Sequence, residues 1–128
     1  MAERPLLFDR YQLVERLGRG AYATVYLAQD TRMGRPVAVK VIEDSIDVDG
    51  RALREAQAAA KLDHPHIVTV HEVLRESSRT LLITEYVDGR TLRDAYAHGG
   101  LADVEVVQMG IQTCKALEHA HRRKVVHR

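Results

Sequence analysis

The sequence lacks the features that mark secreted and membrane-spanning proteins. Its 128 residues include one cysteine, three prolines and no tryptophan. The single cysteine, Cys114, excludes an intrachain disulfide and leaves no cysteine pair for a zinc knuckle. No apolar run approaches the roughly 18 residues that a membrane-spanning helix needs. The N-terminal residues also lack the apolar core of a secretory signal. These absences predict a cytoplasmic chain without a membrane segment of its own, and they leave a membrane anchor further downstream open.

An excess of charge of either sign is also missing. The 19 Lys and Arg residues nearly balance the 18 Asp and Glu residues, for a formal net charge of +1. Such a chain has no field that would recruit nucleic acid or anionic lipid, so neither is expected as a partner. The hydrophobic content of 45% is ample for a packed core. The length fits one ordinary domain or part of a larger one.

The pattern of apolar residues and turn residues predicts strands followed by helices. One helix, capped by Asp49 and stopped by His64-Pro65, interrupts the predicted strands. An antiparallel sheet that carries one helix and is followed by further helices defines the α+β class. The predicted strands cover about 13–17, 25–28, 37–42, 67–73 and 80–86, and the predicted helices cover about 50–62, 91–97 and 102–122.

A glycine turn, Gly18-Arg19-Gly20, joins the first two predicted strands. Glycine lets the backbone approach a phosphate closely and removes the penalty for a positive φ angle. By itself the turn is a weak signal, because glycine hairpins are common. A dinucleotide-binding fold would need a helix to open at these glycines. Here a strand follows the glycines instead, which favours a glycine-rich flap that covers a bound nucleotide.

Two charged residues are predicted to point inward and to pair. Lys40 stands in an apolar strand, where burial without a partner is costly. Glu55 lies at helical spacing from Ala52, Ala59 and Leu62, on the small apolar stripe that should face the sheet. Each residue also has an explanation that involves no site: Lys40 could point to solvent from an edge strand, and Glu55 could be solvated on the helix surface. The two together favour an ion pair.

Several motifs follow one another in a fixed order along the chain. They are Leu17–Val25, Val37-Ala38-Val39-Lys40, Arg54-Glu55-Ala56, His64-Pro65-His66-Ile67-Val68, Glu85-Tyr86-Val87 and Val126-His127-Arg128. Together they resemble the N-terminal lobe of a bacterial eukaryotic-like serine/threonine protein kinase, over about residues 11–128. That resemblance implies a five-stranded antiparallel sheet with one helix, followed by the first helices of a C-terminal lobe. It divides the chain into a leader (1–10), the N-lobe and hinge (11–87) and the start of the C-lobe (88–128).

The resemblance implies that the chain binds ATP and that the full-length form transfers the γ-phosphate to a protein Ser or Thr hydroxyl, with Mg²⁺ bound by residues beyond 128. Lys40 would hold the α- and β-phosphates while paired to Glu55. The implied ATP-binding residues are Leu17, Val25 and Ala38 over adenine; Gly18, Arg19, Gly20 and Ala21 over the phosphates; Thr84 as gatekeeper; Glu85 and Val87 at the adenine edge; and Asp88 near the ribose. His127 and Arg128 would have structural roles in the catalytic loop.

This sequence departs from the kinase pattern at two points. Ala23 replaces the third glycine of the loop, which is a mild change. The sequence also stops at Arg128, one residue before the aspartate that would orient the substrate hydroxyl. We therefore expect these 128 residues alone to be inactive in phosphoryl transfer. A non-catalytic module that binds a nucleotide or a partner, and a fragment of a small-molecule phosphotransferase, stay open as alternatives.

The histidines and the apolar residues of the last predicted helix, including Cys114, are not expected to form a functional site. The histidines lack the ligand spacing of a tetrahedral metal site, so no metal is expected within this chain. Val107, Ile111, Cys114 and Leu117 form an apolar stripe on the last helix, and Cys114 is expected to be buried in it. Without packing partners, a stripe of this kind favours self-association.

Overall fold

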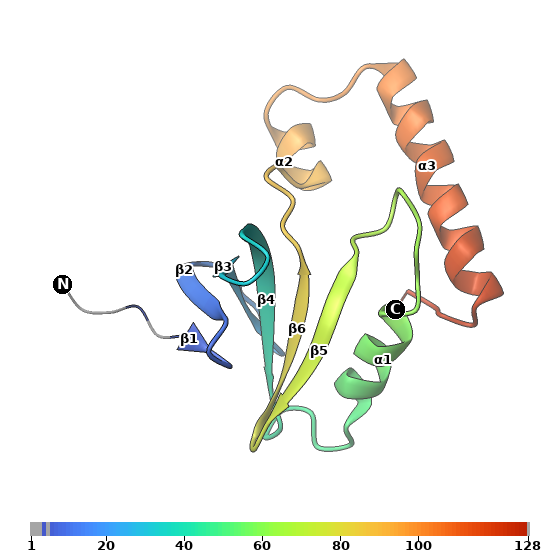
Figure 1. Cartoon of the computed structure of the whole chain (residues 1–128). Coiled ribbons are helices and arrows are strands. Elements are labelled where there is room, and N and C mark those ends of the chain that lie inside the picture. Colours follow the sequence, from blue (N-terminus) through green and yellow to red (C-terminus); the bar gives the residue numbers. More distant parts are fainter. Residues whose placement is uncertain (1–3, 5, 128) are drawn as a thin grey trace. The chain divides into compact units, whose positions relative to one another are not determined.

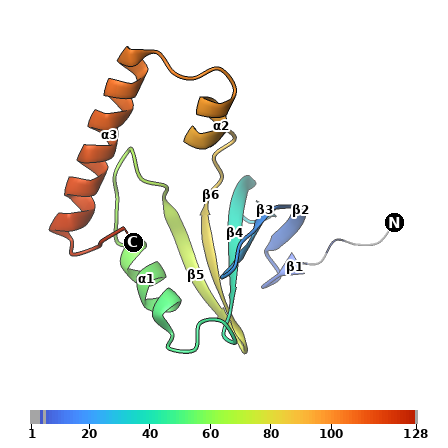
Figure 2. The ribbon, with the colours of Figure 1, turned by 180° about the vertical axis from the view of Figure 1, so that it is seen from behind.

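The structure, a computed structural model, describes residue 4 and residues 6–127, and these form two compact units. The first unit is the chain up to Lys61 together with Thr69–Tyr86. The second unit combines Leu62–Val68 with the chain from Val87 onward. Figure 1 shows the strands and α1 of the first unit and the two helices of the second, and Figure 2 shows the same ribbon from behind.

The first unit is built on a six-stranded antiparallel sheet in the order β1-β2-β3-β4-β6-β5. Five of its strands confirm the predicted sheet. The sixth, β1, falls in the segment that was expected to be a leader. The strands are β1 (Leu6–Leu7), β2 (Tyr11–Arg19), β3 (Thr24–Asp30), β4 (Arg35–Glu43), β5 (Val70–Glu76) and β6 (Arg79–Glu85).

One face of this sheet is the hydrophobic core, and we call it the core face. Side chains alternate between the two faces of a strand, so Val37, Val39 and Val41 of β4 share this face. Val37 and Val39 have no exposed surface, and neither have Leu81 and Ile83 of β6. The β-branched residues of this run pack well on a pleated surface, which explains why β4 is a central strand. The core cluster consists of Tyr11, Ala28, Val37, Val39, Val41, Leu81 and Ile83.

The helix α1 (Arg51–Ala59) packs against β5 and β6, and it lies beside β5 in both ribbon views (Figures 1 and 2). Its N-cap is Gly50, whose φ of 63° is a left-handed conformation that glycine adopts without strain. Both carboxylate oxygens of Asp47 accept from the Ala52 N–H at 3.0 Å. Asp47 therefore satisfies the free N–H of the first turn, and the prediction that Asp49 caps this helix is wrong.

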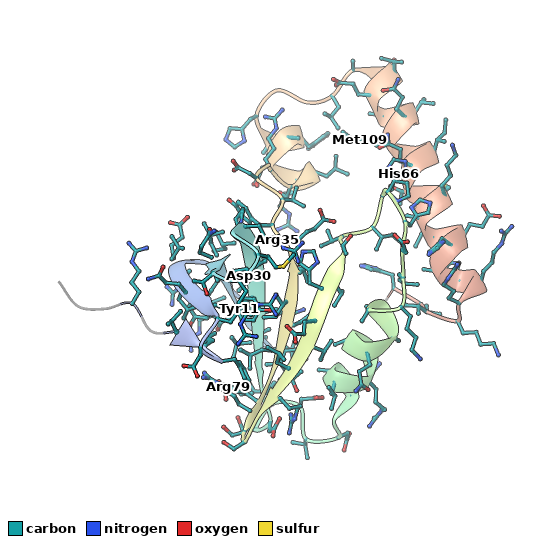
Figure 3. All side chains as sticks on the ribbon, in the orientation of Figure 1. Tyr11, Asp30, Arg35, His66, Arg79 and Met109 are labelled. Atoms are coloured by element: carbon teal, nitrogen blue, oxygen red, sulfur yellow. The ribbon has the colours of Figure 1, made fainter. Side chains whose placement is uncertain are left out.

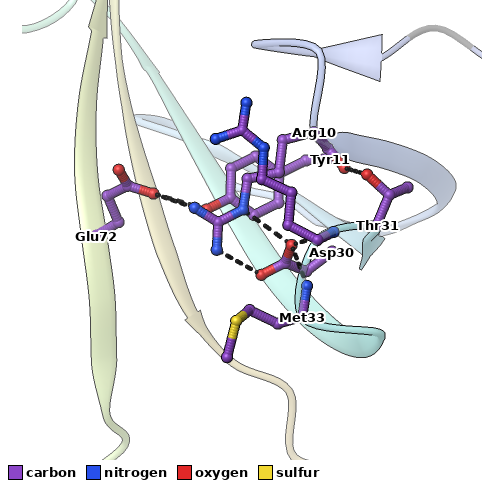
Figure 4. Close-up of polar contacts among 7 residues, drawn as sticks. Arg10, Tyr11, Asp30, Thr31, Met33 and Glu72 are labelled. Atoms are coloured by element: carbon purple, nitrogen blue, oxygen red, sulfur yellow. Dashed lines mark hydrogen bonds and ion pairs between the residues drawn. The ribbon is translucent and has the colours of Figure 1, made fainter.

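A polar network on β2, β3 and β5 ties the edge of the sheet to the core (Figure 4). The Arg10 guanidinium donates twice to the Asp30 carboxylate, both times at 2.8 Å, and once to Glu72 at 3.4 Å. The Tyr11 hydroxyl donates to the same Glu72 oxygen at 2.7 Å. Asp30 is only 1% exposed, and its hydrogen bonds from Arg10 lower its pKa to about 2. Burial, together with Glu72, raises the pKa of Tyr11.

The second unit contains the helices α2 (Leu92–Ala97) and α3 (Asp103–Arg122). The Thr91 hydroxyl caps α2 by accepting from the Asp94 N–H at 3.1 Å. The Glu105 carboxylate caps α3 by accepting from the Ala102 N–H at 3.0 Å. Both predicted helices are therefore confirmed with defined starts. None of the helices in the described part of the chain is long and apolar enough to cross a bilayer.

The apolar stripe of α3 is largely solvent-exposed. Val107 is 60% exposed and Ile111 is 51% exposed, while Ala120 is the buried residue of this helix. Cys114 is exposed as well, so the prediction that it is a buried small hydrophobe is wrong. The helical periodicity placed it correctly on the stripe, but periodicity says nothing about whether a stripe has anything to pack against.

Candidate functional site

The strand register places five of the residues expected to contact a nucleotide on one face of the sheet, opposite the core face. Directly paired residues of antiparallel strands point to the same side. Val25 of β3 pairs with Lys40 of β4, and Gly18 of β2 pairs with Val25. Across the other side of β4, Ala38 pairs with Thr84 of β6. Because residues 38 and 40 are two apart in one strand, all five residues share this face, which we call the Lys40 face.

Around these five residues the Lys40 face is accessible to solvent, in contrast to the core face on the same strands. Further along the same face, Ile42 and Thr80 are buried. Val25, Ala38 and Thr84 are partly buried, and Lys40 is exposed. Leu17 is 43% exposed at the bulge in β2 next to the glycine turn. An apolar surface that is partly accessible and carries one cation suits a ligand with a flat apolar part and an anionic part.

The glycine turn keeps space open above its backbone. The Gly20 N–H donates to the Ala23 carbonyl at 2.8 Å, which closes the turn. Neither Gly18 nor Gly20 has a positive φ, so no left-handed conformation is required there. A Cβ added to Gly18 would meet no atom within 4 Å, which leaves that space open. Because Ala23 contributes only its carbonyl to the turn, alanine closes the turn as well as glycine would.

Glu55 occupies a different position from the one predicted. Its side chain is 57% exposed, and its carboxylate accepts from the Arg51 Nε at 2.9 Å on the same helix. The buried residue of α1 is Ala56, one position further along the helix. Successive helical residues are rotated by about 100°, so burial of Ala56 leaves Glu55 at the border of the packed stripe. Lys40 and Glu55 stand on β4 and α1 of the same compact unit.

The end of β6 is held by hydrogen bonds around Glu85. The Glu85 N–H donates to the Thr69 carbonyl at 2.9 Å, and the Glu85 carboxylate accepts from the Thr69 N–H at 2.7 Å. The Thr84 hydroxyl donates to the Glu85 carbonyl at 3.1 Å. A carbonyl oxygen has two lone pairs, so the contact with Thr84 alone does not saturate the Glu85 carbonyl. These contacts hold the expected adenine-edge group in place.

Three further predicted site residues, Val87, Asp88 and His127, belong to the second unit, whereas Arg19 and Ala21 belong to the first. Val87 is 62% exposed and accepts from the Gly89 N–H at 3.0 Å through its carbonyl. Asp88 follows Val87 directly in this segment, and His127 is exposed near the C-terminal end. Arg128 lies outside the described residues. In the described part of the chain, no group of three or more His, Cys, Asp or Glu side chains could hold a metal ion.

The sequence reasoning missed a pocket of about 290 Å³ next to the glycine turn. Tyr26 and Val41 line this pocket, and they alternate with Val25 and Lys40, so the pocket lies on the core face of the sheet. Arg19 and Arg79 also line it; Arg79, labelled in Figure 3, pairs with Glu76. The alternation of side chains along β2 could have indicated this pocket, because it places the Arg19 side chain opposite Thr24 and away from the Lys40 face.

Comparison with known proteins identifies the family to which this chain belongs. Residues 11–128 match the model of the protein kinase domain. The chain is also similar to a solved structure of Rad53, residues 1–466, in complex with AMP-PNP, with a TM-score of 0.83 and 28% sequence identity. That similarity covers 94% of this chain and 33% of the Rad53 chain. The chain belongs to the protein kinase family.

The similar full-length proteins narrow the class to bacterial serine/threonine kinases. A probable serine/threonine-protein kinase of Streptomyces coelicolor is 42% identical over 100% of this chain and 20% of its own length. PrkC of Bacillus subtilis is 38% identical over 93% of this chain and 19% of its own length. PknB of Mycobacterium leprae is 37% identical over 100% of this chain and 22% of its own length. The chain therefore spans about a fifth of the length of the curated relatives it matches.

Proposed function

We propose that this chain is the ATP-binding part of a serine/threonine protein kinase and that ATP binds on the Lys40 face. In the full-length protein, the γ-phosphate of ATP would pass to a Ser or Thr hydroxyl of a protein substrate. The observation that carries the proposal is the strand register, which aligns Gly18, Val25, Ala38, Lys40 and Thr84 on one accessible face. The AMP-PNP in the similar Rad53 structure supports a nucleotide as the ligand.

Each part of ATP has a chemically suitable group on this chain. Leu17, Val25 and Ala38 would cover the adenine ring, with Thr84 behind it. The Glu85 carbonyl and the Val87 backbone would bind the adenine edge, and Asp88 would meet the ribose. The Lys40 ammonium is the cation for the α- and β-phosphates. Phosphate oxygens would occupy the open space above the Gly18 backbone, where Arg19, Gly20 and Ala21 would cover them.

Glu55 would hold Lys40 in place for the phosphates. In the present structure its carboxylate interacts with Arg51 at the border of the packed face of α1. A rotation of α1 about its axis by less than one residue step would turn this carboxylate toward the sheet. We therefore propose that nucleotide binding and the position of α1 are coupled through Glu55.

Phosphoryl transfer needs more than these residues supply. The transferred phosphate requires metal ions that neutralise its charge and a residue that orients the hydroxyl. Mg²⁺ would enter bound to the ATP phosphates, since the described residues include no cluster able to hold a metal. We therefore propose that a polypeptide of these 128 residues binds ATP without transferring its phosphate. We also propose a cytoplasmic location and, for the full-length form, a protein substrate. The near balance of 19 basic and 18 acidic residues supports protein over nucleic acid as the partner.

The test compares a Lys40→Ala variant with a matched Lys61→Ala variant of the 128-residue chain. Both lysines are exposed and both lie in the first unit. Fluorescence polarisation with a fluorescent ATP analogue, competed by unlabelled ATP, should show binding that K40A weakens by about tenfold or more, the expected loss of a charge-assisted contact. The K61A variant should bind as the parent chain does.

Two outcomes would overturn the proposal. Equal affinity of the parent chain and K40A would remove Lys40 from the site. Radiolabel transfer from [γ-³²P]ATP and Mg²⁺ to a generic acceptor protein, lost in K40A, would show that these residues do catalyse. If no nucleotide binds and a protein partner binds equally well to both variants, the non-catalytic module is the better description.

A further inference from the structure

Three histidines of the second unit join the segment Leu62–Val68 to α3. The His119 Nε2 on α3 lies 3.3 Å from the backbone N–H of Asp63, which donates to it. The His64 and His119 rings pack at 5.1 Å between centroids, and the His64 and His66 rings pack edge to face at 5.5 Å. The His66 N–H donates to the His64 Nδ1 at 3.1 Å. We call this group, His64, His66 and His119 with the Asp63 N–H, the histidine latch.

Both ring nitrogens that accept in the histidine latch must be unprotonated. A neutral imidazole offers one acceptor nitrogen, and an imidazolium offers none. In His119 the acceptor is Nε2, so Nδ1 carries the proton. The Arg123 guanidinium lies 3.1 Å from that Nδ1, and it can donate to the His119 carbonyl at 3.4 Å instead. In His64 the acceptor is Nδ1.

Protonation of His119 would turn its acceptor nitrogen into a donor. The new Nε2–H would face the Asp63 N–H, and the added charge would stand beside Arg123, which already faces the Nδ1–H of the neutral ring. The charged groups around His119 are mostly cationic: Arg122 and Arg123 come from α3 and His64 from the segment, with Asp63 as the acidic neighbour. Burial first, and then Arg123 and His64, lower the pKa of His119, while Asp63 raises it. Arg122 is itself paired with Glu118 at 2.6 Å on the exposed side of α3.

We propose that the histidine latch is a proton-sensitive contact: it is closed while His119 is neutral, and protonation of His119 opens it and releases the segment Leu62–Val68 from α3. This segment is the chain connection between α1, which carries Glu55, and β5. Acidification would therefore loosen one end of the segment that follows α1. The geometry of the latch carries this inference independently of nucleotide binding.

The sign of the pH effect follows from linkage. A histidine whose pKa is lowered in the closed state binds its proton more readily when the latch is open. The closed state is thus fully favoured above the ordinary histidine pKa, about 6.5. It loses stability as the pH falls from there through the lowered value. For one proton, the opening equilibrium rises by at most about tenfold per pH unit within that window.

Hydrogen exchange of the 128-residue chain, read by mass spectrometry on peptides that cover 62–68, tests the proposal between pH 7.5 and pH 5. Rates are corrected for the intrinsic pH dependence of amide exchange. The parent chain should lose protection in this segment as the pH falls. His119→Gln keeps an acceptor near the Nε2 position and cannot titrate, so its protection should stay constant. His119→Leu removes the acceptor and should leave the segment weakly protected at every pH.

A matched control is His98→Gln, at the end of α2, where the His98 Nδ1 contacts the Asp94 carbonyl of its own helix at 2.8 Å. This variant should keep the pH profile of the parent chain. A pH-independent protection in the parent chain would overturn the proposal, and so would an H119Q profile that follows the parent profile. Because H119Q retains the hydrogen bond, the test still decides if H119L fails to fold.

Pocket-lining residues give a second readout in the same unit. His66 also lines a pocket of about 560 Å³ with Met109 of α3 and Leu92 of α2 (Figure 3). Opening of the histidine latch would move the segment that carries His66 relative to α3, and with it one wall of this pocket. We therefore expect the methyl resonance of Met109 to shift with the same midpoint as the exchange profile, and to stay unshifted in H119Q. A shift of equal size in H119Q would contradict the latch.

Discussion

The sheet of the first unit and the helix α3 of the second carry similar apolar residues, but these are buried in the sheet and exposed on the helix. In the sheet, Leu81 and Ile83 are completely buried on the core face. On α3, Val107 and Ile111 are more than half exposed. The difference shows that hydrophobic periodicity defines a face, while burial depends on whether another element covers that face.

The largest effect should come from truncating a leucine in the covered region. Leu81→Ala should lower the free energy of unfolding by about 3 kcal/mol, because it removes buried methyl groups and leaves a cavity. Leu117→Ala on α3, where the leucine is 36% exposed, is the matched change and should cost much less. Urea unfolding followed by circular dichroism measures both. Equal losses would mean that the two regions are packed alike, which would contradict the difference in burial between the sheet and α3.

An intermediate effect is expected at the edge of the sheet. Asp30→Asn keeps the size of the side chain and removes the charge that Arg10 binds at 2.8 Å. It should destabilise the chain by about 2 kcal/mol at pH 7, the range for a hydrogen bond to a charged partner.

The pH dependence of that variant sharpens the test. The pKa of Asp30 is lowered from 3.8 to about 2 in the folded state. Its contribution is therefore present above about pH 4 and is lost as the pH falls through 2. Urea midpoints between pH 2 and pH 6 should rise less steeply in D30N than in the parent chain. Identical slopes would show that the network in Figure 4 does not hold the carboxylate ionised.

The smallest effect on stability, and a clear one on association, is expected on the uncovered helix. Ile111→Lys changes a residue that is 51% exposed, so the free energy of unfolding should change by less than about 0.5 kcal/mol. The exposed stripe favours self-association, and a lysine in it should oppose that. Sedimentation velocity should show the parent chain self-associating and I111K shifted toward monomer. A parent chain that stays monomeric at high concentration would contradict the expectation for the stripe.

Local patterns predicted most of the elements. The alternation in Val37–Ile42 identified a strand and placed Lys40 and Ala38 on one side of it, as the register has it. That this strand is central was not predicted. The start of α2 and the extent of α3 followed from helix periodicity and composition. The helix α1 was also found, and Ala52 and Ala59 of the predicted stripe are partly buried, but Ala56 takes the buried position and Glu55 lies at the border of the packed face. A stripe of small residues is wide enough to allow that error.

Long-range pairs were beyond prediction from local patterns. Arg10 lies 20 residues from Asp30 and 62 residues from Glu72. The Asp63 N–H and the His119 ring are 56 residues apart. No local signal distinguishes such partners from any other charged or titratable residue. The two-residue strand β1 is equally invisible, because it exists only through its pairing with Gln12 and Tyr11.

The order of local motifs, readable in the sequence itself, determined the family and the strand and helix types, because side-chain period and backbone freedom are local properties. It also predicts the residues that would contact ATP. Tertiary structure alone decided which apolar faces are covered, which carboxylate meets Arg10 and where the histidines gather. These depend on the distances between segments remote in sequence, and those distances are set by the packing of the whole unit.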